Sequence, residues 1–144
     1  MTQIDGGLRP IFRDKLKKGW HWQSVETGGT GLGVPDSNFC KSGVERWVEF
    51  KQTDAWACTL RPEQVAWHRR RALCGGRSFI AVRRWHDGGP RKGPPVDELW
   101  LFYGEDAMRL KDRGLCAEGV VDLGIWKGGP SRWDWDEIGE LLIS

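Results

Sequence analysis

Two carboxylates and a lysine lie near the ends of the segment GVPDSNFCKSGVERWVEFK, which covers residues 33–51. Ser42-Gly43 in its middle is a turn dipeptide, and it predicts a β-hairpin with a two-residue turn. In that register Asp36 lies directly opposite Glu49, and cross-strand partners on one face have Cβ atoms about 4.5–5.5 Å apart. Lys51 follows two residues after Glu49, so it falls on the same face of the sheet.

Two negative charges at that distance destabilise a hairpin unless a positive charge lies between them. A divalent cation meets this need, because hard ions such as Mg²⁺ bind carboxylate oxygens and keep water for exchange. The sequence therefore predicts a metal centre at the open end of the hairpin. The alternative is a solvated hairpin end with one surface salt bridge to Lys51. A Glu-x-Lys triplet alone decides nothing, since composition predicts it roughly 0.5 times in a chain of this length.

The order of these motifs resembles that of the PD-(D/E)xK nuclease superfamily. The matching residues are Pro35-Asp36 and Glu49-Phe50-Lys51, separated by a strand turn. Within the superfamily, the run GVPD…WVEFK…LRPEQVAWHRRRALCGGRSFIAVRR is similar to small stand-alone VRR-NUC and phage Holliday-junction-resolvase type endonucleases. The resemblance covers about residues 20–85. It implies a restriction-endonuclease-like catalytic core there, with residues 86–144 as a C-terminal extension of a single nuclease domain, 1–144.

The resemblance also implies roles for individual residues. Asp36 and Glu49 would ligate Mg²⁺, or Mn²⁺ in its place, with the backbone carbonyl of Phe50 as a further ligand. Lys51 would orient or deprotonate the attacking water, or stabilise the charge that develops on the phosphate. Gln64, in the first turn of a predicted helix, would assist the site or contact a phosphate. The alternative for Gln64 is an exposed glutamine on a helix surface.

The superfamily usually adds an acidic residue upstream, and this chain offers two candidates. Glu26 closes the predicted strand WHWQSVE and precedes the loop GGTGLG, so it could reach the metal directly. Asp14 lies in the first predicted helix. We favour Glu26 as the third catalytic and metal-binding acid and keep Asp14 as the alternative.

Basic residues in two predicted helices could follow the phosphates of DNA. The candidates for DNA contact are Lys15, Lys17, Lys18, His68, Arg69, Arg70 and Arg71. His68 has no second motif histidine, so we interpret it as a phosphate contact or a surface residue rather than a catalytic base. The alternative is a solvated helix face. The first 95 residues hold 17 Lys/Arg and 9 Asp/Glu and the rest hold 5 and 11, which also favours an anionic partner for the first two-thirds.

The chain has 10 tryptophans, an unusual number for its length. Trp47, Trp67, Trp85 and Trp100 lie inside predicted elements, so core packing is their expected use. A second group could instead stack on an unpaired base or line a dimer interface. That group consists of Trp20, Trp22, Trp133 and Trp135.

The elements that must position these residues follow from periodicity and turn signals. Helices are predicted over residues 8–18, 61–73, 106–113 and 133–143, and strands over 20–26, 36–41, 44–52, 78–85, 98–103 and 120–126. Thr59 is the expected N-cap of the second helix, and Pro62 suits its first turn. This order predicts an α/β fold with a central mixed β-sheet flanked by helices.

Composition limits the class of protein. With 39% hydrophobic and 29% charged residues in 144, one globular domain is expected. Apolar runs stay well below the roughly 18 residues of a membrane span, and the N-terminal stretch lacks the apolar core of a signal peptide. The cysteines form no CxxC pair, so no structural zinc site is predicted. We expect a cytoplasmic location, that of the host if a phage encodes the chain.

The expected function is metal-dependent hydrolysis of DNA, with branched DNA such as a Holliday junction as the preferred substrate. A resolvase makes two symmetric cuts, so a homodimer is expected. Within the same class, the alternative is a non-specific, nicking or restriction-like nuclease. Outside it, the chain could be a DNA-binding module with a nuclease fold that does not cut, or an unrelated α+β interaction protein.

Overall fold

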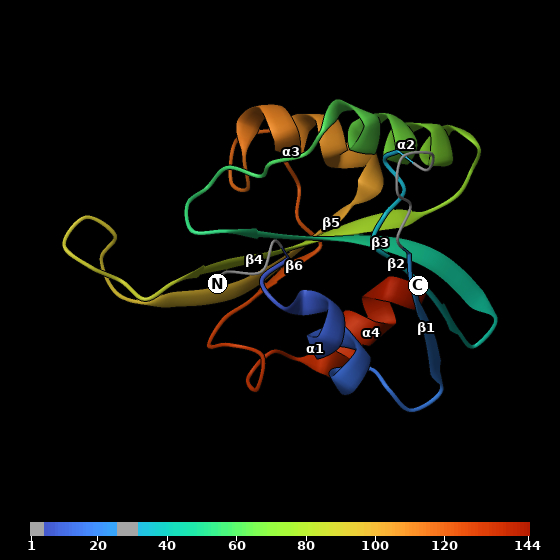
Figure 1. Ribbon diagram of the computed structural model, residues 1–144, viewed down its shortest axis with the longest axis horizontal. Helices are drawn as coiled ribbons and strands as arrows, with labels where there is room; N and C mark the ends of the chain where they lie inside the picture. The colour runs from blue at the N-terminus through green and yellow to red at the C-terminus, as the bar shows by residue number, and fades with distance from the viewer. Residues whose placement is uncertain (1–4, 26–31) are drawn as a thin grey trace.

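The computed structural model describes residues 5–25 and 32–144, which form a mixed six-stranded β-sheet flanked by four α-helices (Figure 1). The strands are β1 (Trp20–Ser24), β2 (Ser37–Lys41), β3 (Val44–Thr53), β4 (Ser78–His86), β5 (Val96–Tyr103) and β6 (Gly124–Trp126). The helices are α1 (Leu8–Lys15), α2 (Pro62–Leu73), α3 (Ala107–Arg113) and α4 (Trp135–Ile143), with a 3₁₀ turn η1 (Gly104–Asp106) before α3. The predicted α/β fold with a mixed sheet and flanking helices is confirmed.

The six strands lie in the sheet in their order along the chain. All neighbouring strands are antiparallel except β3 and β4, which are parallel. Parallel neighbours need a crossover connection, and α2 provides it. Strands β5 and β6 extend this same sheet, so residues 86–144 contribute to the same sheet as residues 20–85.

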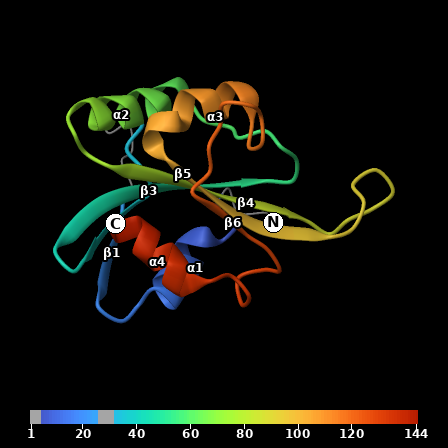
Figure 2. The ribbon, with the colours of Figure 1, turned by 180° about the vertical axis from the view of Figure 1, so that it is seen from behind.

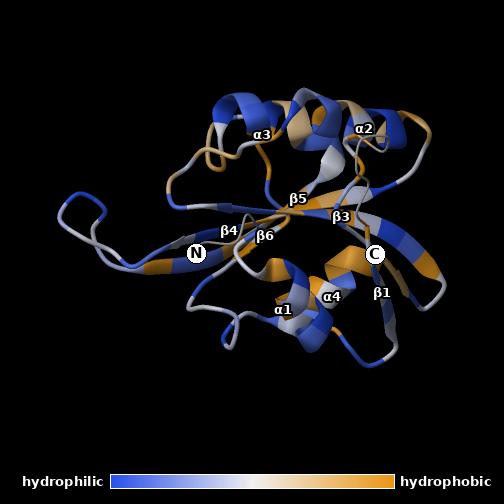
Figure 3. Cartoon of the chain, viewed as in Figure 1, coloured by the Kyte–Doolittle hydropathy of each residue, from blue (hydrophilic) through white to orange (hydrophobic). Residues whose placement is uncertain are grey.

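The two faces of the sheet carry separate apolar cores. One core includes Val48 and Phe50 of β3 with the apolar sides of α1 and α4, and the other lies under α2 and α3. Figure 1, and Figure 2 from behind, show these two helix pairs on opposite sides of the sheet. Hydropathy colouring places the hydrophobic residues in the middle of the sheet and hydrophilic ones in the loop between β4 and β5 (Figure 3). Alternation along β3 therefore directs Glu49 and Lys51 toward the α2 side.

Helix α2 begins differently from the prediction. Its N-cap is Arg61 rather than Thr59, and Pro62 occupies the first helical position as expected. Gln64 makes half of a capping box, because its side-chain Oε1 accepts a hydrogen bond of 2.9 Å from the Arg61 N–H. This hydrogen bond to the N-cap residue holds the Gln64 side chain at the start of the helix.

Candidate active site

The β2–β3 hairpin has the register that its turn predicts. Ser42 and Gly43 both have positive φ, 53° and 78°, as a type I′ turn requires, and Ser37 pairs with Val48. Asp36 lies just before β2 begins, and its side-chain Oδ2 accepts a hydrogen bond of 2.9 Å from the Phe50 N–H. The carboxylate is thereby fixed beside Glu49.

Glu49 is the most unusual carboxyl group of this region, because it is only 1% exposed. Its pKa is raised to about 9, chiefly by burial and then by the neighbouring Asp36, through a hydrogen bond between the two carboxyl groups and through charge repulsion; Lys51 opposes the shift. Two carboxyl groups within hydrogen-bonding reach therefore share one pocket of low polarity. A bound cation would remove the conflict between them.

Gln64 connects the acidic and basic members of the site. Its Nε2 donates a hydrogen bond of 2.8 Å to Glu49 Oε1, and its Oε1 accepts one of 3.1 Å from Lys51 Nζ. The exposed-helix alternative for Gln64 is wrong, since the side chain is buried. The structure thus brings together four side chains from the residue before β2, from β3 and from the start of α2: Asp36, Glu49, Lys51 and Gln64.

Gly33, three residues before Asp36, approaches the same helix start closely. Gly33 has φ +84°, and a Cβ at this position would lie 2.1 Å from the backbone oxygen of Glu63. Only glycine tolerates both the left-handed backbone and this approach. This contact holds Gly33 against the first turn of α2.

The donor set suits a hard divalent cation. Asp36 and Glu49 each engage one oxygen in the hydrogen bonds above, and carboxylate oxygens are the ligands that Mg²⁺ prefers. Within residues 5–25 and 32–144, no group of three or more His, Cys, Asp or Glu residues is arranged to hold a metal.

The favoured third acid, Glu26, lies outside the described residues. Asp14 is exposed on α1, on the opposite face of the sheet, so the alternative third acid is wrong.

His68 is not a surface residue, which corrects its assignment as a DNA contact. The side chain is fully buried, and its Nδ1 lies 2.7 Å from Ser78 Oγ. Burial, followed by the charge of Lys51, lowers the pKa of His68 to about 4, so the ring is neutral at physiological pH. Gly104 packs tightly on this pair, because a Cβ there would lie 2.4 Å from the histidine Nδ1.

The remaining basic candidates fall into two separate groups. Arg69 and Arg70 are exposed on α2, and Arg71 is half-buried with its guanidinium carbon 4.5 Å from the centre of the Trp67 ring. The lysines are exposed at the end of α1, on the other face of the sheet; they are Lys15, Lys17 and Lys18. The structure therefore does not bring the two groups together on one surface.

Two tryptophans differ from their expected roles. Trp85, an expected core residue, is 39% exposed, and Trp133, an expected stacking residue, is buried. Trp56, to which the sequence analysis assigns no role, is 48% exposed. No periodic pattern surrounds Trp56, so the sequence offered only the residue type, a tryptophan, as an indication of a role.

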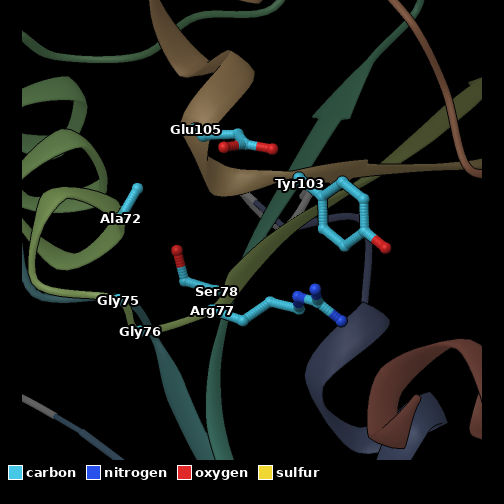
Figure 4. Close-up of a pocket in the computed structure, with 7 residues that line it drawn as sticks. All are labelled: Ala72, Gly75, Gly76, Arg77, Ser78, Tyr103 and Glu105. Atoms are coloured by element: carbon cyan, nitrogen blue, oxygen red, sulfur yellow. The ribbon is translucent and has the colours of Figure 1, made fainter.

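A small cavity lies at the far end of α2 from Gln64. It has a volume of about 150 Å³ and is lined by Ala72, Gly75, Gly76, Arg77, Ser78, Tyr103 and Glu105 (Figure 4). Arg77 lies over the Tyr103 ring, with 5.0 Å between the guanidinium carbon and the ring centre. The twelve residues of α2 span about 18 Å, so this cavity is separate from the carboxylates.

No protein-family model matches the sequence, and no curated protein matches it. The functional conclusion therefore depends on the residues and their geometry.

Proposed function

We propose that this chain is a Mg²⁺-dependent endonuclease that hydrolyses phosphodiester bonds in DNA. The observation that carries the proposal is the buried Glu49 beside the half-buried Asp36, linked through Gln64 to Lys51. The same residues carry the resemblance to the PD-(D/E)xK nucleases. A binding module without activity has no use for two adjacent carboxylates where a phosphate must approach, because they would repel it.

Each residue has a distinct part in this reaction. Asp36 and Glu49 would hold Mg²⁺, or Mn²⁺ in its place, through the oxygens that their protein hydrogen bonds leave free. The bound ion lowers the pKa of water and neutralises the charge of the phosphate. Lys51 places its ammonium group beside the carboxylates, where it orients the attacking water or stabilises the charge that develops on the phosphate oxygens. Gln64 keeps both partners in place through its two hydrogen bonds.

Branched DNA is the substrate that we propose, on the strength of the resemblance to stand-alone junction resolvases. Paired cuts across a junction need two catalytic sites related by symmetry, so the proposal includes a homodimer. The exposed arginines of α2, Arg69 and Arg70, belong to the same layer as Gln64, where they can contact phosphates flanking the cut. Among the described residues, no helix is long and apolar enough to cross a bilayer.

The proposal is tested by incubating the protein with a labelled four-way junction, a linear duplex and a single strand of matched sequence. We expect cleavage of the junction in Mg²⁺ or Mn²⁺ and none in EDTA. Equal cleavage of all three substrates would indicate a non-specific nuclease. Cleavage that persists in EDTA would reject the metal mechanism, and binding without any cleavage would indicate the inactive module. Light scattering on the purified protein tests the homodimer.

A further inference from the structure

Trp56 is an exposed aromatic residue on the sheet face that carries the candidate active site. Its side chain is 48% exposed, although the ring is large and apolar. Thr53 pairs with Arg84 and Lys51 pairs with Val82 in the β3–β4 register, and Arg84 lies under the Trp56 ring. Val82 and Arg84 are two residues apart on β4, so the ring lies on the same sheet face as Lys51, beyond the end of β3.

The ring of Trp56 is held in place from several sides. The guanidinium carbon of Arg84 lies 3.8 Å from the ring centre, and the Trp100 ring meets Trp56 edge-on at 6.0 Å. The Trp56 backbone oxygen accepts a hydrogen bond of 2.8 Å from the Leu115 N–H. A side chain fixed before binding loses little conformational entropy when a ligand stacks on it.

Arg84 supports the ring rather than acting as a phosphate contact. Its Nη1 pairs with Glu98 Oε1 at 3.0 Å, and its Nε donates a hydrogen bond of 3.0 Å to the Ala55 backbone oxygen. The charge is thus neutralised by a partner of the same chain and is only 11% exposed. Because Arg84 is already paired, the group available to a ligand here is the exposed ring of Trp56.

We propose that Trp56 is a stacking platform for an unpaired DNA base, on the sheet face that carries the candidate active site. The inference rests on the proposed nuclease function and adds the form of DNA that the site selects. Bases within a duplex are already stacked on their neighbours, so only a base that has left the helix can cover the ring. Unpaired bases occur at junctions and flaps. Stacking on Trp56 would therefore favour these forms of DNA, and it would do so independently of their base sequence.

Trp85 provides a matched control within the same chain. It is 39% exposed, and the guanidinium carbon of Arg83 lies 3.9 Å from its ring centre. Arg83 is paired with Asp97 at 2.7 Å, as Arg84 is with Glu98. This second tryptophan–arginine pair lies on the face of α1 and α4, away from the carboxylates. Any general effect of an exposed tryptophan on DNA binding should therefore appear at both positions.

The test measures binding in EDTA, so that no cleavage occurs. The probes are a labelled oligothymidylate of about 12 nucleotides and a blunt duplex of equal length, followed by fluorescence anisotropy. Trp56→Leu keeps an apolar side chain but removes the ring, and we expect it to weaken single-strand binding about 10-fold, within a range of about 5- to 100-fold. Trp56→Phe should lose less. Duplex binding by these variants, and all binding by Trp85→Leu, should stay within about 2-fold of the wild type.

The proposal is overturned if the wild type does not bind the single strand, or if Trp56→Leu and Trp85→Leu give equal effects. It is also overturned if Trp56→Leu weakens duplex binding as much as single-strand binding. Circular dichroism confirms that each variant is folded, and Trp56→Phe keeps the test valid should the leucine variant fail to fold. Because no cleavage is measured, absence of nuclease activity with the expected binding pattern would reject the nuclease function and leave the stacking role standing.

Discussion

Replacing Glu49 with glutamine should stabilise the metal-free protein, and more strongly as the pH rises. In the unfolded chain this carboxyl group ionises near pH 4.5, whereas in the folded protein its pKa is about 9. Between these values folding takes up a proton, so the stability of the wild type falls by about 1.4 kcal/mol for each pH unit. Glutamine has the shape of the protonated carboxyl group and can still accept the hydrogen bond from Gln64. The stability gained by Glu49→Gln should therefore grow by about 3 kcal/mol between pH 6 and pH 8.

The assay is urea unfolding in EDTA at pH 6, 7 and 8, followed by tryptophan fluorescence. Glu45→Gln is the control, because Glu45 is exposed on the same strand. Addition of Mg²⁺ should stabilise the wild type and leave Glu49→Gln nearly unchanged, since only the charged carboxylate binds the ion. A difference between Glu49→Gln and the wild type that stays constant across these pH values would refute the reasoning about the buried Glu49 carboxyl group.

Three further changes test other parts of the site. Gln64→Ala should slow cleavage about 10- to 100-fold, measured as initial rate on a junction, because it releases both Glu49 and Lys51; an unchanged rate would contradict that role. Gly33→Ala should lower the free energy of unfolding by more than about 2 kcal/mol, whereas Gly43→Ala, with positive φ but open space, should cost only about 1–2 kcal/mol. The buried His68 should make the wild type lose stability as the pH falls from 6.5 toward 4, by about 1.4 kcal/mol per unit, and His68→Asn should remove this slope in urea titrations. An equal loss of unfolding free energy in Gly33→Ala and Gly43→Ala would contradict the close contact at Gly33. The same pH slope in the wild type and in His68→Asn would contradict the role given to His68.

The hairpin and its charged end follow from local signals in the sequence. The Ser42-Gly43 turn determines the register, and the register places Asp36 beside Glu49 without any knowledge of the rest of the fold. Gln64 follows Pro62 at the start of α2, so its position at a helix terminus is also local. These parts were predictable because each depends on residues close together in the chain.

The sequence did not reveal which side chains are buried or which face of the sheet each helix covers, because both depend on contacts between distant segments. His68 looks like part of a basic helix surface, yet its spacing of four residues from Gln64 places both side chains on the buried face. Asp14 was excluded only when α1 was found on the other face of the sheet. Trp56 is positioned by Arg84, 28 residues away, and no periodicity indicates that contact.

The most direct test of the central claim compares wild type and Asp36→Asn on a labelled four-way junction in Mg²⁺. The substitution keeps the shape of the side chain and a carbonyl oxygen for the Phe50 N–H, but it removes one charged ligand. We predict that cleavage falls by more than about 100-fold, since loss of an outer partner of a metal site already costs about 10- to 100-fold. Junction binding in EDTA should stay within about 3-fold. Full cleavage by Asp36→Asn would contradict the assignment of Asp36 and Glu49 as the metal-binding pair of a nuclease.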